Sequence, residues 1–216
     1  MRTDGIIFDL DGTLWDSSRV VAESWRTTLG RDFGCALAPD AAAVRSIMGM
    51  TAADIARKLF SDFGDDALKV CLQCIKEENE YIARHSGDVY PGVEDMLSEL
   101  SERCGLYIVS NCLDGYIQCF LRCTGFDRYI RDFECEGRTG LDKAGNISLV
   151  IRRNGLRAPV YIGDTAGDER SAAAAGCVFI HAAYGFGTAE APAAVIKRPG
   201  DLPGVISGLK GESVNA

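Results

Sequence analysis

The chain has 216 residues, of which 47% are hydrophobic, which supports one substantial core with a small second lobe and argues against disorder. Its formal net charge of −8 argues against a nucleic-acid partner, which would require a clustered basic face. No apolar run approaches the roughly 20 residues that span a bilayer, and no signal peptide precedes the first predicted strand. We therefore expect a cytoplasmic protein without a membrane partner.

The first predicted strand is a short apolar run, Gly5 to Phe8, that continues into Asp9, Asp11 and a Gly-Thr turn. This pattern is typical of a buried strand that delivers acids to its carboxyl end. Because open parallel sheets bind ligands at that end, the position favours chemistry over packing. A solvated turn is the alternative interpretation, since Asp and Gly are ordinary turn residues.

Residues 16–85 carry helical periodicity only. Capping residues and apolar residues at helical spacing predict helices that begin near Asp16, Pro39 and Thr51, and a fourth over residues 67–83. An all-helical block that interrupts a strand–helix alternation suggests an inserted lobe. We therefore predict a helical domain over residues 16–85 and a core domain over residues 1–15 and 86–216.

Strands and helices alternate after residue 89, with buried strands predicted over residues 106–109, 129–133, 160–162 and 177–180. Strands joined by helices imply a mostly parallel sheet that is covered on both faces. The expected fold class is thus α/β, a Rossmann-like parallel sheet core with an inserted all-helical cap domain. We expect only the last several residues to be disordered.

Polar side chains follow three of the predicted strands. They are Asp9 and Asp11, then Ser110 and Asn111, and finally Asp164 and Asp168, while Lys143 begins a helix between the last two sets. In a parallel sheet these strand ends face the same way. Two like charges about 4 Å apart repel by about 4 kcal/mol at an effective dielectric near 20, so the carboxylates must bind protons or share a cation. A hard divalent cation with oxygen-only ligands is the favoured answer.

The nine cysteines raise the question of a metal or disulfide framework. Cys71 and Cys74 have a zinc-like spacing, but the sequence has no second such pair. An odd total without an export signal favours reduced thiols that behave as small hydrophobic side chains, so we expect no structural disulfide.

The string Phe-Asp-Leu-Asp-Gly-Thr-Leu at residues 8–14 resembles the first motif of the haloacid dehalogenase superfamily of phosphotransferases. The order and spacing of the later polar sets resemble its other motifs, and residues 16–85 resemble its helical cap. Within the superfamily the chain is most similar to the phosphoglycolate phosphatase-like branch. The resemblance implies a magnesium-dependent phosphatase that hydrolyses small phosphate monoesters, phosphoglycolate or another phosphorylated metabolite, through an aspartyl-phosphate intermediate.

The same resemblance implies a metal site. Asp9 and Asp164 would bind the metal directly, together with the carbonyl of Asp11. Asp168 would support the site. A plain turn or helix-cap role is the alternative for Asp164 and Asp168.

Phosphoryl transfer requires a nucleophile, charge neutralisation and a proton for the leaving oxygen. We expect Asp9 to be the nucleophile. Asp11 is then free to protonate the leaving alcohol and afterwards to activate water. Lys143 would supply a fixed positive charge, and phosphate oxygens would be held by Thr13, Ser110 and Asn111 with neighbouring backbone amides.

Three further features carry weaker signals. Gly49 and Met50 lie at a break between the predicted helices, where a loop could close over the crevice and contact substrate, or could simply form a turn. The loop of residues 184–187 resembles one near the substrate in the phosphatase branch. We assign no catalytic role to His85 or His181.

Three alternative functions remain. A dehalogenase is disfavoured because it would not need Asp11. A phosphomutase of the β-phosphoglucomutase type would carry a cap histidine shortly after the first motif, where this chain has residues 20–22, Val-Val-Ala. A binding or regulatory protein on the same fold is the third possibility. We expect a small phosphorylated metabolite as partner and a monomer or homodimer.

Overall fold

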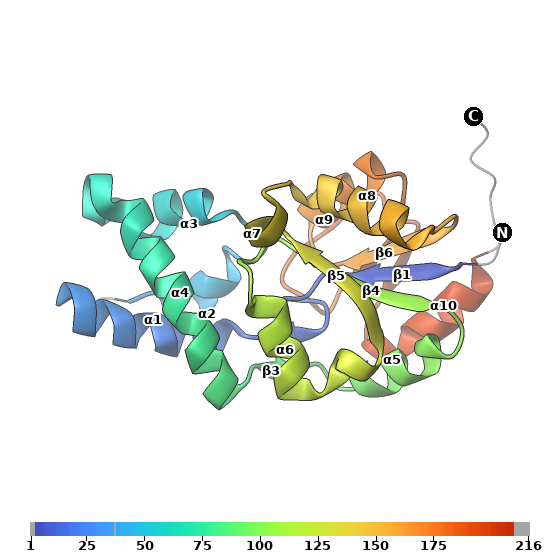
Figure 1. Cartoon of the computed structure of the whole chain (residues 1–216), viewed down its shortest axis with the longest axis horizontal. Coiled ribbons are helices and arrows are strands. Elements are labelled where there is room, and N and C mark those ends of the chain that lie inside the picture. The colour runs from blue at the N-terminus through green and yellow to red at the C-terminus, as the bar shows by residue number, and fades with distance from the viewer. Residues whose placement is uncertain (1–2, 37, 210–216) are drawn as a thin grey trace.

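The computed structural model describes residues 3–36 and 38–209. A six-stranded sheet lies at its centre in the order β5-β4-β1-β6-β7-β8, and all its neighbouring strands run parallel (Figure 1). The strands are β1 (Gly5–Phe8), β4 (Gly105–Ser110), β5 (Ile130–Cys135), β6 (Pro159–Gly163), β7 (Val178–Ala182) and β8 (Ala194–Ile196). The expected α/β class with a Rossmann-like sheet is confirmed.

Helices cover both faces of this sheet because side chains alternate along β1. Ile6 and Phe8 belong to one buried cluster, which α5, α6 and α10 complete, whereas Ile7 belongs to a second cluster with residues of α8 and α9. These helices are α5 (Val93–Ser101), α6 (Tyr116–Thr124), α8 (Lys143–Asn154), α9 (Ala166–Ala174) and α10 (Leu202–Gly208). Short helical segments complete this part: η2 (Phe126–Arg128), α7 (Glu136–Thr139) and η3 (Pro199–Asp201).

The position of β1 determines where its acids lie. β1 is flanked by β4 and β6, and its last residue, Phe8, aligns with Ile108 and Ile162. Asp9 therefore leaves the sheet near its middle, beside the carboxyl ends of two neighbouring strands.

A group of helices at the left of Figure 1, which we call the helical lobe (residues 18–85), lies beyond these carboxyl ends. It consists of α1 (Ser18–Phe33), α2 (Ala41–Arg45), α3 (Ala52–Leu59), η1 (Ser61–Asp66) and α4 (Ala67–His85). The all-helical character expected of this segment is observed, while its status as a separate domain stays a prediction.

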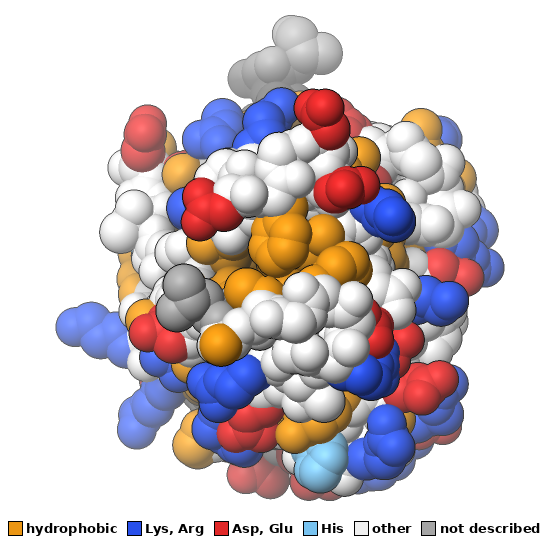
Figure 2. All heavy atoms as spheres, turned by 90° about the vertical axis from the view of Figure 1, so that its left-hand side faces the viewer, with side chains coloured by type: hydrophobic (Ala, Val, Ile, Leu, Met, Phe, Trp, Pro, Cys, Tyr) orange, Lys and Arg blue, Asp and Glu red, His pale blue; other side chains and the backbone are white. Residues whose placement is uncertain are grey.

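Figure 2 views the molecule from this end, where hydrophobic side chains at the centre are surrounded by interspersed charges of both signs.

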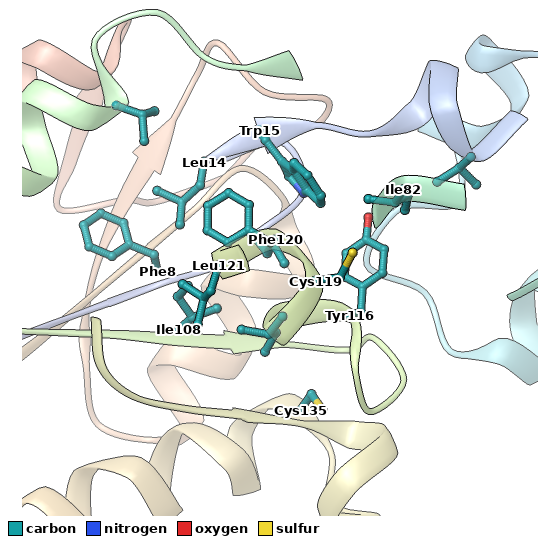
Figure 3. Packing of buried hydrophobic residues seen from close by; sticks show 14 of the residues in the cluster. Phe8, Leu14, Trp15, Ile82, Ile108, Tyr116, Cys119, Phe120, Leu121 and Cys135 are labelled. Carbon is teal, nitrogen blue, oxygen red and sulfur yellow. The ribbon is translucent and has the colours of Figure 1, made fainter. Parts of the chain in front are cut away.

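A small antiparallel ribbon, which the sequence did not predict, joins the lobe to the sheet. It pairs β2 (Trp15–Asp16) with β3 (Asp88–Val89). Trp15 is fully buried there, with its ring centroid 4.9 Å from that of Phe120 in an edge-on arrangement (Figure 3). The segment that leaves the sheet for the lobe is thus anchored in the core.

Other sequence expectations concern short elements, the C-terminus, disulfides and membrane-spanning helices. Strands of two or three residues are too short for a detectable alternation, so β8 was missed along with the ribbon, and α10 was also missed. The disorder expected of the last residues falls on 210–216, outside the described residues. No disulfide joins any of the nine cysteines, all of which lie in described ranges.

None of the helices within 3–36 and 38–209 is long and apolar enough to cross a membrane.

Candidate active site

Three buried carboxylates meet at the carboxyl end of the sheet. Asp9 follows β1, Asp164 follows the adjacent β6, and Asp168 lies in the first turn of α9. Each offers one oxygen, and these oxygens lie within 4.8 Å of one another. The structure therefore brings together three acids that the sequence placed at two separate strand ends.

Lys143, the first residue of α8, lies between two of these acids. Its Nζ is 2.9 Å from Oδ1 of Asp9 and 2.6 Å from Oδ1 of Asp168, and the lysine is only 5% exposed. Burial alone would lower the pKa of Lys143, but the charges of Asp168 and Asp9 raise it above its ordinary value, so the lysine stays protonated. One ammonium against three carboxylates leaves an excess of negative charge.

Asp164 is the one acid of the cluster that Lys143 does not contact. Burial, followed by repulsion from Asp168, raises its pKa to about 7, although the amide of Phe186 donates a hydrogen bond of 2.7 Å to its Oδ2. Its Oδ1 is buried and has no hydrogen-bond partner in the described part of the chain. Burial also raises the pKa of Asp9, against the opposing effect of Lys143. An orphaned carboxylate oxygen beside two further oxygens and an uncompensated charge fit a hard divalent cation.

Glycines allow the loop after β1 and the loop of residues 184–187 to lie against each other and against Asp164. Gly12 has a φ of +84°, and a Cβ at this position would lie 2.3 Å from Oδ2 of Asp164. A Cβ on Gly185 would lie 2.3 Å from the carbonyl oxygen of Gly12. The loop of residues 184–187 holds Asp164 through the amide of Phe186. The proximity of this loop to substrate stays a prediction.

The carboxyl group of Asp11 points away from the acid cluster. Its Oδ1 accepts hydrogen bonds from Ser17 Oγ at 2.7 Å and from Tyr116 OH at 2.9 Å. Burial raises the pKa of Asp11 to about 6, while these two donors act in the opposite direction. Asp9 and Asp11, two residues apart in sequence, therefore have separate environments.

The expected phosphate-binding residues lie at or just after the carboxyl ends of the neighbouring strands β1 and β4. Thr13 is fully buried, and its Oγ1 has no hydrogen-bond partner within the described ranges. Ser110, at the end of β4, is 5% exposed. Asn111 donates from Nδ2 to the carbonyl oxygen of Gly49 at 2.8 Å, which links the sheet to the helical lobe.

A cavity lies between the lobe and the sheet. Asp11, Ser110, Asn111, Gly49 and Met50 all contribute to its wall. The two lobe residues singled out from sequence thus meet the strand-end residues at a single space. Its other walls come from the helical lobe and from Cys112, Leu113 and Tyr116.

Ser17, Tyr116 and the amide of Phe186 are parts of the site that the sequence did not predict. Ser17 carried only a helix-capping signal, although its side chain makes no cap hydrogen bond and donates to Asp11. Tyr116 showed only helical periodicity. His181 Nε2 donates to the carbonyl oxygen of Asp164 at 3.1 Å, which is a structural contact.

A family model described as "haloacid dehalogenase-like hydrolase" matches residues 6–182. No curated protein matched the sequence.

Solved structures are similar to the chain over nearly its whole length. A haloacid dehalogenase-like hydrolase from Streptococcus pneumoniae is 24% identical with a TM-score of 0.79, covering 94% of this chain and 98% of that one. A predicted phosphoglycolate phosphatase from Haemophilus somnus is 20% identical with a TM-score of 0.79, covering 95% and 98%. A CbbY variant from Rhodobacter sphaeroides, in complex with xylulose-1,5-bisphosphate, is 17% identical with a TM-score of 0.77, covering 93% and 96%. At these identities the similarity establishes the fold.

Proposed function

Because the chain belongs to the haloacid dehalogenase-like hydrolase family, we propose that it is a magnesium-dependent phosphatase of small phosphate monoesters. One observation carries this proposal: Asp9 lies in a buried acid–lysine cluster, whereas Asp11 faces the neighbouring cavity. Two carboxylates in separate environments can divide the work, one as the nucleophile for phosphorus and the other as the acid for the leaving oxygen.

Asp9, Asp11 and Lys143 have different roles in the proposed reaction. An oxygen of Asp9 attacks the phosphorus and forms an aspartyl-phosphate, while protonated Asp11 gives its proton to the departing alcohol oxygen. Ionised Asp11 then takes a proton from the water that hydrolyses the aspartyl-phosphate. Lys143 holds Asp9 in place through its ion pair and places positive charge beside the phosphate oxygens.

The remaining site residues bind and orient the phosphate group. Thr13, in the loop after β1, and Ser110, at the end of the adjacent strand β4, are buried and would bind the phosphate oxygens, with Asn111 at the edge of the cavity. Mg²⁺ would be held by Asp9, Asp164 and the carbonyl of Asp11, with Asp168 in support, and would neutralise charge on the phosphate.

We expect phosphate release to require added magnesium and to be inhibited by calcium. Calcium takes more ligands at longer distances, so it would disturb the alignment of Asp9 with the phosphorus. The measurement is phosphate release from a panel of phosphorylated metabolites with magnesium, with calcium and with chelator. Full turnover in calcium with magnesium removed would contradict the proposal.

Ser17→Ala is expected to move the acidic limb of the pH–kcat profile to higher pH by about one unit. Burial raises the pKa of Asp11 and the Ser17 hydroxyl lowers it, so loss of that hydroxyl raises the pKa further. A higher pH is then needed to ionise Asp11 for the hydrolysis of the aspartyl-phosphate. Ser18→Ala is the matched control, because Ser18 is also buried and its hydroxyl has no partner among the described residues. A profile that does not move in Ser17→Ala would argue against Asp11 as the base.

A phosphomutase of the β-phosphoglucomutase type is the alternative enzyme. It would need to bind a second phosphate. No lysine, arginine or histidine is among the described residues that line the cavity next to Asp11. Phosphate release without a sugar bisphosphate would exclude the mutase, and the absence of turnover would favour a binding or regulatory role.

A cytoplasmic location and a monomeric or homodimeric state stay predictions.

A further inference from the structure

The cavity beside Asp11 has apolar walls. The helical lobe contributes Val21, Trp25, Ile47, Ile55 and Ile75 to them. Its volume of about 70 Å³ is room for on the order of five water-sized groups, so it fits a small leaving alcohol rather than a large one. An apolar body on that alcohol would replace water favourably against these walls.

Glu78 of α4 is an acidic residue in this apolar wall. It is only 7% exposed, and its Oε2 accepts a hydrogen bond of 2.7 Å from Nε1 of Trp25. The indole is a neutral donor, so it satisfies one oxygen without compensating a charge. The mechanism proposed above does not use this residue.

The groups that face Glu78 do not favour its ionisation. Cys71 and Cys74 lie on the same helix, Tyr116 faces it from α6, and Asp11 faces it from the loop after β1. All four are acids. Burial, reinforced by the charge of Asp11, raises the pKa of Glu78 to about 8, so at neutral pH it is mostly an uncharged carboxyl group.

The position of its proton follows from the hydrogen bond to Trp25. Because Oε2 accepts from the indole, the proton is placed on Oε1. Within residues 3–36 and 38–209, Oε1 has no hydrogen-bond partner. Glu78 can therefore donate a hydrogen bond into the cavity.

We propose that Glu78 determines substrate specificity as an uncharged donor, selecting phosphate esters whose small leaving alcohol has an apolar body and an uncharged oxygen acceptor at its far end. This inference rests on the phosphatase function proposed above. A leaving group with a carboxylate or a second phosphate would be buried here without a cation to pair with, which is costly. Phosphoglycolate and sugar bisphosphates are therefore disfavoured as substrates.

Three esters of equal chain length test the proposal: pentyl phosphate, the same chain with a ketone near its far end, and the same chain ending in a carboxylate. Near neutral pH we expect kcat/KM for the ketone ester to exceed that for pentyl phosphate by about fivefold, the effect of one hydrogen bond. We expect the carboxylate ester to be slower than pentyl phosphate by about tenfold or more.

The ratio of the ketone ester to pentyl phosphate should depend on pH. Above a pH of about 8 ionised Glu78 cannot donate, so the ratio should fall to one or below. Effects of Asp11 and of the phosphate group act equally on both esters and cancel in the ratio. This series needs no variant.

Two substitutions sharpen the test. Glu78→Gln keeps a donor that does not titrate, so the ratio should stay near fivefold at every pH. Glu78→Met removes the donor, and the ratio should fall to about one while pentyl phosphate is still hydrolysed. Glu80→Gln, on the exposed side of the same helix, is the control and should behave as the wild type.

Two results would overturn the assignment of Glu78 alone: a preference for the carboxylate ester, or a wild-type ratio that does not change with pH. Should Glu78→Met fail to fold, the wild-type pH series still decides. The phosphatase proposal itself, and this inference with it, would be overturned if magnesium supported no release of phosphate from these esters and none from an activated aryl phosphate.

Discussion

Asp9→Asn is expected to lose phosphate release by on the order of a thousandfold or more with every ester and at every magnesium concentration. The substitution removes the attacking oxygen and one member of the oxygen cluster with Asp164 and Asp168. It also removes the negative charge that Lys143 contacts at 2.9 Å. Because the amide has nearly the same size as the carboxyl group, the fold should persist.

Steady-state phosphate release, with circular dichroism to verify folding, measures this loss. Asp95→Asn is the matched control, because Asp95 is exposed on α5, on a different element from every proposed site residue. If Asp9→Asn kept more than about a tenth of the activity, a direct attack by water would explain the reaction better.

Lys143→Met should destabilise the metal-free protein by about 3–5 kcal/mol at slightly alkaline pH, because it leaves buried carboxylates without their cation. The lysine is 5% exposed and contacts Asp9 and Asp168. Methionine preserves most of the apolar stem, so lost packing contributes little. Urea unfolding in the presence of chelator measures the difference.

The destabilisation should shrink as the pH falls. The pKa of Asp164 is raised to about 7 in the folded state, so between the unfolded value and about 7 the folded state binds more protons than the unfolded state. Stability therefore decreases as pH rises through this range, and loss of Lys143 strengthens the effect. Magnesium at a hundred times its dissociation constant should restore about 2.7 kcal/mol.

Lys69→Met provides the control, because Lys69 is 78% exposed and should change stability by no more than about 0.5 kcal/mol. A Lys143→Met protein that is as stable as this control in chelator would contradict the charge account of the cluster.

Much of the fold follows from local pattern. The apolar runs before Asp9, Ser110 and Asp164 are strands because each is buried on both faces of a parallel sheet. Once those strands are parallel, their polar ends must converge, so the acid cluster is a consequence of topology. The helical lobe was equally visible, because capping residues such as Thr51 accept from the amide three residues later.

The separation of Asp9 from Asp11 could not be predicted from spacing. Two residues in a strand that are separated by one position share a face, so a continued strand would have put both acids together. The strand ends at Phe8, however, and Gly12 turns the chain with a φ of +84°. Asp11 therefore faces Ser17 and Tyr116 instead of Asp164.

Glu78 was also invisible in the sequence, because its role depends on contacts between distant segments. Its hydrogen bond to Trp25 spans 53 positions, and it lines the same cavity as Asp11. On the helix its position shows the periodicity of an ordinary amphipathic face. Only the packing of α1 against α4 shows that this carboxyl group is buried.

The central claim is that Asp9 is phosphorylated while Asp11 serves the leaving group and the attacking water. Its most direct test is rapid quenching of Asp11→Asn after mixing with an activated aryl phosphate and magnesium, followed by intact-mass spectrometry and peptide mapping. We expect one phosphoryl group on the peptide that contains Asp9, because this leaving group needs no proton and hydrolysis of the aspartyl-phosphate is slow. Asp9→Asn should carry none. A phosphoryl group on Asp11 in the Asp9→Asn protein, or no trapped adduct in any variant that still turns over, would contradict the claim.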